Sequence, residues 1–302
     1  MELKEENKNS LLKDYLQLIK PALSILVVFS SVISYLLVPG VLYDPLRLIL
    51  LFIGGLLVTG SANTINQVVE KDTDAKMKRT AKRPIASGRM TPEHGWGFAV
   101  ITGALGVFIL GYFFNWVAAS IAAFSLFLYA FVYTPLKKKN SIAVLVGAFP
   151  GALPCLIGWV AGFLHGQEIA WTGGLILFAF QFLWQFPHFW AIAWVAHKDY
   201  SAAGFKLLPS DKGPTKFTAL QTVVYSLLLL PITIAPFYTD IADFNGIKGM
   251  IAFGLVILAN IFMIYRAVML YISMDASAAR KVMFGSYLYL PIVMFAWLLA
   301  KP

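Results

Sequence analysis

The sequence predicts an all-α, polytopic membrane protein that crosses the bilayer nine times. Of its 302 residues, 59% are hydrophobic and only 13% are charged, whereas a soluble domain is usually about half apolar and about a quarter charged. The apolar residues gather in nine runs, each near the roughly 20 residues that a membrane-spanning helix needs. Basic residues gather in every second connection between these runs, which is typical of loops that stay in the cytoplasm.

The nine runs follow one another with polar connections. The first begins at Pro21, after a segment that holds four acids and therefore resembles neither a cleavable signal peptide nor a mitochondrial transit peptide. The third and fourth runs nearly fuse at Asn115. The runs cover residues 21–39, 46–69, 97–114, 116–133, 142–163, 170–196, 217–237, 247–271 and 284–299. We expect one transmembrane domain over residues 1–302, with residues 1–20 as a cytoplasmic N-terminal segment.

The distribution of Lys and Arg predicts the orientation. With the N-terminus in the cytoplasm, 21 of the 24 basic residues fall on the cytoplasmic side, and only Arg47, Lys248 and Lys301 fall on the other. Nine spans then place the C-terminus outside a plasma membrane. The net charge of +9 reflects this topology, so we expect no nucleic-acid partner. Cys155 is the only cysteine, which excludes an internal disulfide and a cysteine-based metal cluster.

The most charged connection follows the second run and has a helical pattern of oxygen ligands. Asn66, Glu70 and Asp74 are four residues apart, so a continuing helix would stack them on one face. Mg²⁺ prefers oxygen ligands and shares the phosphates of its substrate. Arg79 and Arg83 follow, and guanidinium groups bind phosphate oxygens well. The segment therefore predicts a site for a metal and a diphosphate.

A solvated basic loop that only sets the membrane orientation is the alternative interpretation of this segment. Such a loop does not require Asn, Glu and Asp at four-residue spacing, so the pattern argues against it. Asp72 lies two residues after Glu70 and would point about 200° away from it on a continuous helix.

A second polar cluster lies in the sixth run and in the connection after it. Gln181, Gln185 and His188 form a polar stripe on an otherwise apolar helix. Polar groups at membrane depth need partners, so the stripe faces either a neighbouring helix or a cavity. His197 and Asp199 follow at the cytoplasmic end, and Asp199 is a candidate second anchor for a metal or a diphosphate.

These motifs resemble the intramembrane aromatic prenyltransferase superfamily over nearly the whole chain. The first is N-x-x-x-E-x-x-x-D after the second run, followed by K-R-T-x-x-R-P-x-x-S-G. The second is an Asp-bearing loop after the sixth run, which Asp199 matches. The runs H-F-W-A-I-A-x-x-x-H-K-D-Y-x-x-A-G-F-x-L-L-P and Y-T-P-L-K-K-K resemble the members that farnesylate haem. Glu70 stands where many members carry Asp, and Asp199 is one acid where quinone-type members carry several.

The resemblance implies nine transmembrane helices around a central cavity, with the active site facing the cytoplasm. It also implies transfer of a farnesyl group from farnesyl diphosphate to the 2-vinyl group of haem B (protohaem IX), with addition of water. The product would be haem O for haem–copper terminal oxidases. A haem A synthase or assembly factors of such oxidases are the further partners that this pathway implies.

The resemblance and the chemistry of the side chains together suggest roles. Mg²⁺ would stabilise the departing diphosphate, and its expected ligands are Asn66, Glu70, Asp74 and Asp199. The bases expected at the phosphates are Arg79, Arg83, Lys137 and Lys198. Imidazole suits haem iron, and the candidates are His188 and His197, although hydrogen bonding to a neighbouring helix explains each histidine equally well. The candidates to surround the farnesyl cation are the aromatic side chains of Phe182, Trp184, Phe186, Phe189 and Trp190. Contact with lipid explains these rings equally well.

Two other functions stay open. A prenyltransferase of the quinone pathway would share the first motif but accept an aromatic acid or phenol. A haem-binding or transport protein without catalysis belongs to a different class, and it would fit charges near the bilayer centre. The single Asp199 and the two histidines favour haem, and the position of the charges at the cytoplasmic ends favours an enzyme.

Overall fold

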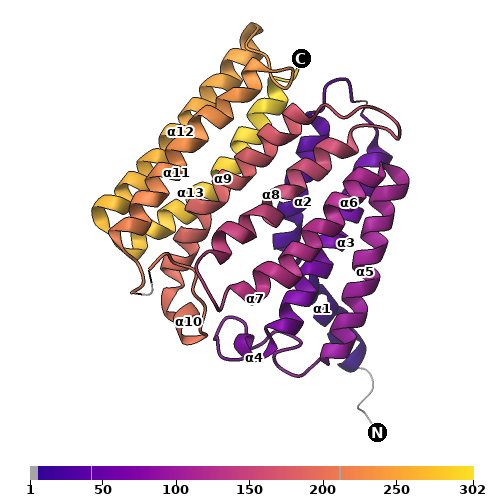
Figure 1. Ribbon diagram of the computed structural model, residues 1–302, viewed down its shortest axis with the longest axis vertical. Coiled ribbons are helices and arrows are strands. Elements are labelled where there is room, and N and C mark those ends of the chain that lie inside the picture. Colours follow the sequence, from indigo (N-terminus) through magenta and orange to yellow (C-terminus); the bar gives the residue numbers. More distant parts are fainter. Residues whose placement is uncertain (1–5, 42, 211) are drawn as a thin grey trace.

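The computed structural model describes residues 6–41, 43–210 and 212–302, and this part of the chain is helical without strands (Figure 1). The N-terminal half contains α1 (Glu6–Ile19), α2 (Pro21–Leu36), α3 (Pro45–Val69), α4 (Lys71–Asp74), α5 (Pro92–Phe113), α6 (Trp116–Phe127), the π-helix η1 (Leu128–Tyr133) and α7 (Thr134–Leu136). The rest contains α8 (Ala143–Ala161), α9 (Trp171–Val195), α10 (His197–Ala202), α11 (Lys216–Ile234), the 3₁₀ helix η2 (Ala235–Tyr238), α12 (Gly246–Ser273) and α13 (Ala276–Leu299).

Eight helical segments of the described residues are long and apolar enough to cross a membrane. They correspond to the second through ninth predicted runs. The first run is different, because α2 has 16 residues and its length of about 24 Å falls short of the roughly 30 Å hydrocarbon core. Residues Leu11–Ile19 and α2 are bent by 43° and make a ninth span when taken together. The count of nine depends on this bent pair, and the orientation stays a prediction.

Asn115 separates the two apolar runs that nearly fuse in the sequence. Its side-chain oxygen accepts a hydrogen bond from the amide of Ala118 at 2.8 Å and so caps α6. Its side-chain nitrogen donates to the carbonyls of Val160 and Phe163, both at 2.9 Å. One buried amide therefore starts α6 and ties that start to the end of α8.

The helices pack around α8. In the membrane-spanning part of α8, 78% of residues are buried, against 33% in α5, α11 and α12, which lie at the edges of the bundle (Figure 1). The last helix, α13, packs against α9 and α2. Lys301 strengthens the contact between the end of the chain and α2, because its ammonium donates to the carbonyls of Leu36 and Val38 at 2.6 and 2.9 Å. The Leu36 carbonyl lies at the end of α2, where helical partners are missing, whereas the Val38 carbonyl also accepts from the amide of Val41 at 3.2 Å.

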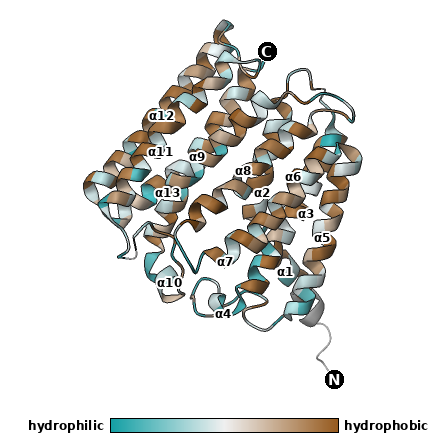
Figure 2. Cartoon of the chain, viewed as in Figure 1, coloured by the Kyte–Doolittle hydropathy of each residue, from teal (hydrophilic) through white to brown (hydrophobic). Residues whose placement is uncertain are grey.

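Helix α1 and the C-terminus lie at opposite ends of the bundle (Figure 1). The end that carries α4, α7 and α10, which we call the α4 end, is also where hydrophilic residues gather (Figure 2). The long helices between the two ends are mostly hydrophobic (Figure 2). Both sequence motifs therefore lie at one end of the molecule.

Candidate functional site

The structure brings the three residues of the first motif together at the α4 end. The helix does not continue unbroken as expected, because α3 ends at Val69 and Glu70 has φ −96° and ψ 12°. Helical spacing is nevertheless kept, since the amide of Asp74 donates to the carbonyl of Glu70 at 2.7 Å. Asn66, Glu70 and Asp74 are all buried, whereas Asp72 is exposed.

Each of the two acids is paired with a base, which comes from the same connection for Asp74 and from beyond η1 for Glu70. Lys137 Nζ lies 2.6 Å from Glu70 Oε1, and Arg83 Nη1 lies 2.7 Å from Asp74 Oδ2. Burial lowers the pKa of the Lys137 ammonium, while the adjacent carboxylate of Glu70 works in the opposite direction. The Lys137 ammonium also lies 5.0 Å from the centre of the Tyr133 ring. The predicted bases Arg83 and Lys137 therefore contact the predicted metal ligands directly.

The π-helix η1 positions Lys137 and orients Asn66. Thr134, directly after η1, donates its hydroxyl proton to the carbonyl of Tyr129 at 2.8 Å. The same hydroxyl oxygen accepts from Asn66 Nδ2 at 3.4 Å. Because the amide nitrogen of Asn66 is used in this way, its oxygen faces the opposite direction. Short π-helical segments within α-helices are frequent at functional sites.

A cavity of about 140 Å³ opens onto this cluster. Its lining includes Asn66, Glu70, Asp74, Arg79, Arg83, Tyr133, Lys137 and Tyr200. Arg79 Nη2 donates to the hydroxyl of Tyr200 at 3.5 Å, which links the first motif to α10. The predicted residues Lys198 and Asp199 are exposed and do not line the cavity. On a helix of six residues, Tyr200 takes the face toward the cavity, and Asp199 is turned about 100° away from it.

The side-chain oxygens of the site show whether it suits Mg²⁺. Asp74 Oδ1 is buried and has no hydrogen-bond partner in the described part of the chain. A buried carboxylate oxygen without a partner is costly, and a hard cation would satisfy it. No group of three His, Cys, Asp or Glu residues converges among the described residues. Two carboxylates and the amide oxygen of Asn66 are the available donors, and Mg²⁺ commonly completes such a set with water and phosphate. The residues fit Mg²⁺.

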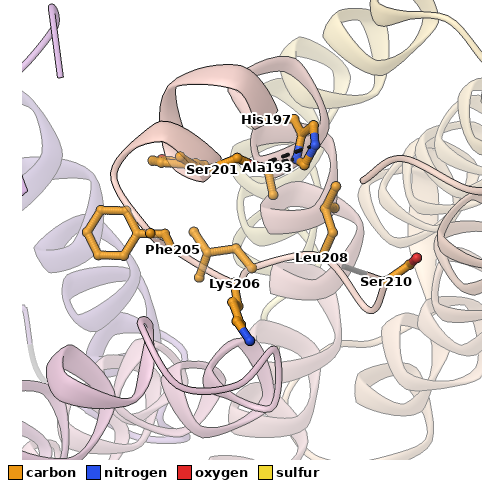
Figure 3. Close-up of a pocket in the computed structure, with 10 residues that line it drawn as sticks. Ala193, His197, Ser201, Phe205, Lys206, Leu208 and Ser210 are labelled. Atoms are coloured by element: carbon orange, nitrogen blue, oxygen red, sulfur yellow. Dashed lines mark hydrogen bonds between the residues drawn. The ribbon is translucent and has the colours of Figure 1, made fainter. Parts of the chain in front are cut away.

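A second cavity of about 290 Å³ adjoins the first and shares Tyr200, Phe205 and Leu207 with it (Figure 3). The predicted haem ligand His197 lines this second cavity, and its ring lies 3.3 Å from the hydroxyl of Ser201. The side chain of Lys206 lines it as well and is directed away from His197 (Figure 3). The two cavities therefore share part of their wall at the α4 end.

His188 has a different environment. It is buried between α9 and α13 and lines neither cavity. Its Nδ1 lies 2.7 Å from the hydroxyl of Ser286, and its ring stacks on Trp184 with centroids 4.7 Å apart. Ser286 also places its hydroxyl 2.6 Å from the carbonyl of Met283, a geometry in which it donates there and accepts from His188. The structure does not bring the two predicted haem ligands together.

The other polar and aromatic residues of α9 serve packing. Gln185 donates to the carbonyl of Ala148 on α8 at 3.0 Å, so this part of the stripe faces a neighbouring helix. Phe186 and Trp190 pack against Tyr225 of α11. The expectation that the α9 aromatics line the reaction cavity therefore differs from the structure, because none of them borders either cavity. The reason is that α8, α11 and α13 all pack against α9.

Lys20, Tyr133 and Tyr200 belong to this cluster, although no role was predicted for them from the sequence. Lys20 Nζ lies 3.5 Å from Asn66 Oδ1, although 46 residues separate the two positions. The sequence shows a lysine directly before Pro21, but only the tertiary structure shows that its side chain lies at the first motif.

Comparisons with known proteins identify relatives of the chain by sequence and by fold. A sequence profile described as the UbiA prenyltransferase family matches residues 27–299. A protein of Cytophaga hutchinsonii named Protoheme IX farnesyltransferase is 43% identical over 95% of this chain and 97% of its own length. A protein of the same name from Christiangramia forsetii is 39% identical over 97% of this chain and 94% of its own.

Two solved structures share the fold. A digeranylgeranylglyceryl phosphate synthase superposes with a TM-score of 0.77 at 23% identity, covering 96% of this chain and 98% of its own. A UbiA homolog from Archaeoglobus fulgidus bound to GPP and Mg²⁺ superposes with a TM-score of 0.67 at 15% identity, covering 94% and 99%. At these identities the likeness concerns the fold.

Proposed function

This chain belongs to the UbiA prenyltransferase family, and on that premise we propose that it transfers a farnesyl group from farnesyl diphosphate to the 2-vinyl group of protohaem IX. Water adds to the same vinyl group, and the product is haem O. The observation that carries the proposal is full-length similarity to proteins named Protoheme IX farnesyltransferase, at up to 43% identity. The paired acids and bases at the α4 end support it, because a diphosphate needs both a metal and cations.

We propose Asn66, Glu70 and Asp74 as the ligands of Mg²⁺, on the strength of the fit described above. Asp199 is the fourth proposed ligand. Its carboxylate is exposed on α10, so its participation requires α10 or its side chain to turn toward α4. When bound, Mg²⁺ supplies Lewis-acid stabilisation of the charge that grows on the leaving diphosphate.

The proposed diphosphate-binding bases are Arg79, Arg83, Lys137 and Lys198. Arg83 and Lys137 lie against the carboxylates of Asp74 and Glu70, and a metal at these carboxylates would weaken both ion pairs. The two bases would then be available to phosphate oxygens a few ångströms away. Such preorganised cations contribute most where charge develops in the transition state.

In the proposed reaction, the allylic C–O bond breaks and the diphosphate leaves with the electron pair. The π electrons of the vinyl group then form the new bond to the farnesyl carbon. Water attacks the cation left on the former vinyl group and loses a proton. No nucleophilic side chain is required, which agrees with a site built of acids, bases and tyrosines.

The cavity lined by His197 is the proposed position of the acceptor, because it shares three residues with the donor cavity. His197 is the proposed contact to the haem there, and Lys206 is a candidate for a propionate. His188 remains a proposed haem ligand, with its Nε2 as the coordinating nitrogen if Ser286 accepts from Nδ1. We further propose a plasma-membrane location with the α4 end in the cytoplasm, and a haem A synthase or oxidase assembly factors as recipients of the product.

The test is an assay of the detergent-purified protein with haem B, farnesyl diphosphate and Mg²⁺, with EDTA as the control and the mass of the haem as the readout. A metal-dependent gain of one farnesyl group and one water supports the proposal. Bound but unmodified haem would favour a non-catalytic haem-binding protein. A prenylated phenol in membranes that contain the protein, with haem unchanged, would favour the quinone pathway.

A further inference from the structure

The junction between α1 and α2 holds a lysine in a conformation that lysine rarely adopts. Lys20 has φ 49° and ψ 69°, and Met274 is the only other non-glycine residue with positive φ in the described part of the chain. A residue with a β-carbon is strained in this region, and Pro21 disfavours a helical conformation at the position before it. Strain of this kind persists only where surrounding contacts hold it, and it concentrates at functional sites.

Side chains of α3 hold the junction in place. Gln67 donates to the carbonyls of Gln17 and Leu18 at 3.1 and 2.9 Å. Asn63 donates to the carbonyl of Ile19 at 3.3 Å. Both side chains are buried, so these bonds satisfy the last carbonyls of α1 where water has little access. The same helix, α3, carries Asn66. These hydrogen bonds therefore fix the position of the strained turn relative to the proposed metal site.

The result of this arrangement is that the Lys20 side chain reaches the site. Its ammonium lies 3.5 Å from Asn66 Oδ1, the oxygen that the hydrogen bond to Thr134 leaves for a metal. Its charge also interacts with the other charged groups of the cluster, which are Glu70, Asp74, Arg83 and Lys137.

Lys20 differs from the other two bases in one respect. Arg83 and Lys137 are each paired with a carboxylate. Lys20 forms no ion pair among the described residues, and its hydrogen-bond acceptor is a neutral amide. A partly buried ammonium without a counter-charge in direct contact is unfavourable. An anionic ligand beside Asn66 would supply that counter-charge.

We propose that Lys20 is a further residue of the donor site, which binds an oxygen of the diphosphate when Mg²⁺ takes Asn66 Oδ1. This inference rests on the proposed function. It extends the donor site beyond the two sequence motifs to the α1–α2 junction. The strained backbone at Lys20 is the feature that directs its side chain to the metal ligand, and Gln67 and Asn63 are the positioning residues that maintain it.

The test measures Mg²⁺-dependent binding of inorganic pyrophosphate to the detergent-purified full chain by titration calorimetry. Lys20→Met should raise the dissociation constant about ten- to a hundredfold, because a hydrogen bond to a charged group is lost. Lys20→Arg keeps the charge and should stay within a few-fold of the wild type. The control is Lys13→Met, which removes an exposed lysine of the neighbouring helix α1 and should leave binding unchanged.

A second variant separates binding from folding. Lys20→Gly should be at least as heat-stable as the wild type, because glycine accepts positive φ without strain. It should nevertheless lose affinity for pyrophosphate as Lys20→Met does. In the full reaction, both variants should raise the KM for farnesyl diphosphate and leave the KM for haem unchanged.

The outcomes distinguish this inference from the proposed function. If the wild type binds Mg²⁺–pyrophosphate and both Lys20→Met and Lys20→Gly bind it equally well, Lys20 is not a donor-site residue, while the proposed function stands. If the wild type shows no Mg²⁺-dependent binding, the donor site itself is wrong, and the role of Lys20 falls with it.

Discussion

Of two aspartates in the same connection, only one should be sensitive to replacement by asparagine. Asp74 is fully buried, pairs with Arg83 at 2.7 Å and has a second oxygen without a partner. Asp72 lies two residues earlier and is exposed. Replacing either with Asn removes one negative charge and keeps the shape of the side chain. Asp72→Asn is therefore a matched control for Asp74→Asn.

The expected magnitudes follow from this geometry. At an effective dielectric constant of about 20, unit charges 2.7 Å apart attract by roughly 6 kcal/mol, most of which the desolvation of both groups offsets. Because Arg83 keeps 21% of its side-chain exposure and Asn still offers it an oxygen, Asp74→Asn should destabilise the fold by only about 1–2 kcal/mol. The rate of transfer should fall about 10²–10³-fold, as for the loss of one group that stabilises transition-state charge. Asp72→Asn should change stability by less than about 0.5 kcal/mol.

The assay is farnesyl transfer to haem at saturating haem, with rates measured across a range of Mg²⁺ concentrations and corrected for folded protein. Asp74→Asn should lower the maximal rate and require more Mg²⁺ to reach it, while Asp72→Asn follows the wild type. Equal rates and equal Mg²⁺ requirements for the two variants would refute the argument. The segment would then be a basic loop in which position does not matter.

Three further predictions address other parts of the molecule. Lys301→Met removes a donor from the carbonyls of Leu36 and Val38, and only the second keeps another bond, from the amide of Val41. It should lower stability by about 1–3 kcal/mol in thermal unfolding, whereas the exposed Lys248→Met should not; equal melting temperatures would contradict a stabilising role of Lys301. Ser286 contacts the ring of His188, and Ser201 contacts the ring of His197. Ser286→Ala should therefore alter the visible absorption of bound haem if His188 is the iron ligand, and Ser201→Ala should do so if His197 is the ligand. An unchanged spectrum in both variants would remove both histidines as ligands. EDTA should abolish farnesyl transfer but leave the visible absorption of bound haem unchanged. Loss of haem together with the metal would mean that the metal site and the haem site are not separate.

The ion pairs at Glu70 and Asp74 also bear on how the donor is bound. Each pair holds a base within 3 Å of a proposed metal ligand. In the proposed donor complex, a metal and a diphosphate that arrive together would replace two protein ion pairs with carboxylate–metal and base–phosphate contacts. The number of favourable charge contacts would thereby be conserved, so donor binding would not leave a buried charge unpaired.

Much of the fold could be predicted from the sequence because long apolar runs have few alternatives in a bilayer. The predicted second to ninth runs each correspond to a helical segment of the structure, and even the near fusion at Asn115 resolves into two helices. The first run was harder, since α2 is short and its bend from α1 follows from the backbone of one residue, Lys20. No pattern in the sequence marks a lysine with positive φ.

The sequence by itself determined the membrane class, the helices and the types of side chain in the first motif. Four-residue spacing brings Asn66, Glu70 and Asp74 to one face as long as the chain keeps a helical turn, and the hydrogen bond from the amide of Asp74 to the carbonyl of Glu70 keeps that turn after α3 ends. Only the tertiary structure decided which bases lie beside them. Lys137 and Lys20 come from segments 67 and 50 residues away from Glu70 and reach the motif, whereas the exposed Lys198 does not reach it. Likewise it placed Tyr200, and not Asp199, in the cavity lining. The physical reason is that contacts across a bundle depend on how helices pack and bend, which involves the whole chain, whereas a helix face depends only on its own residues.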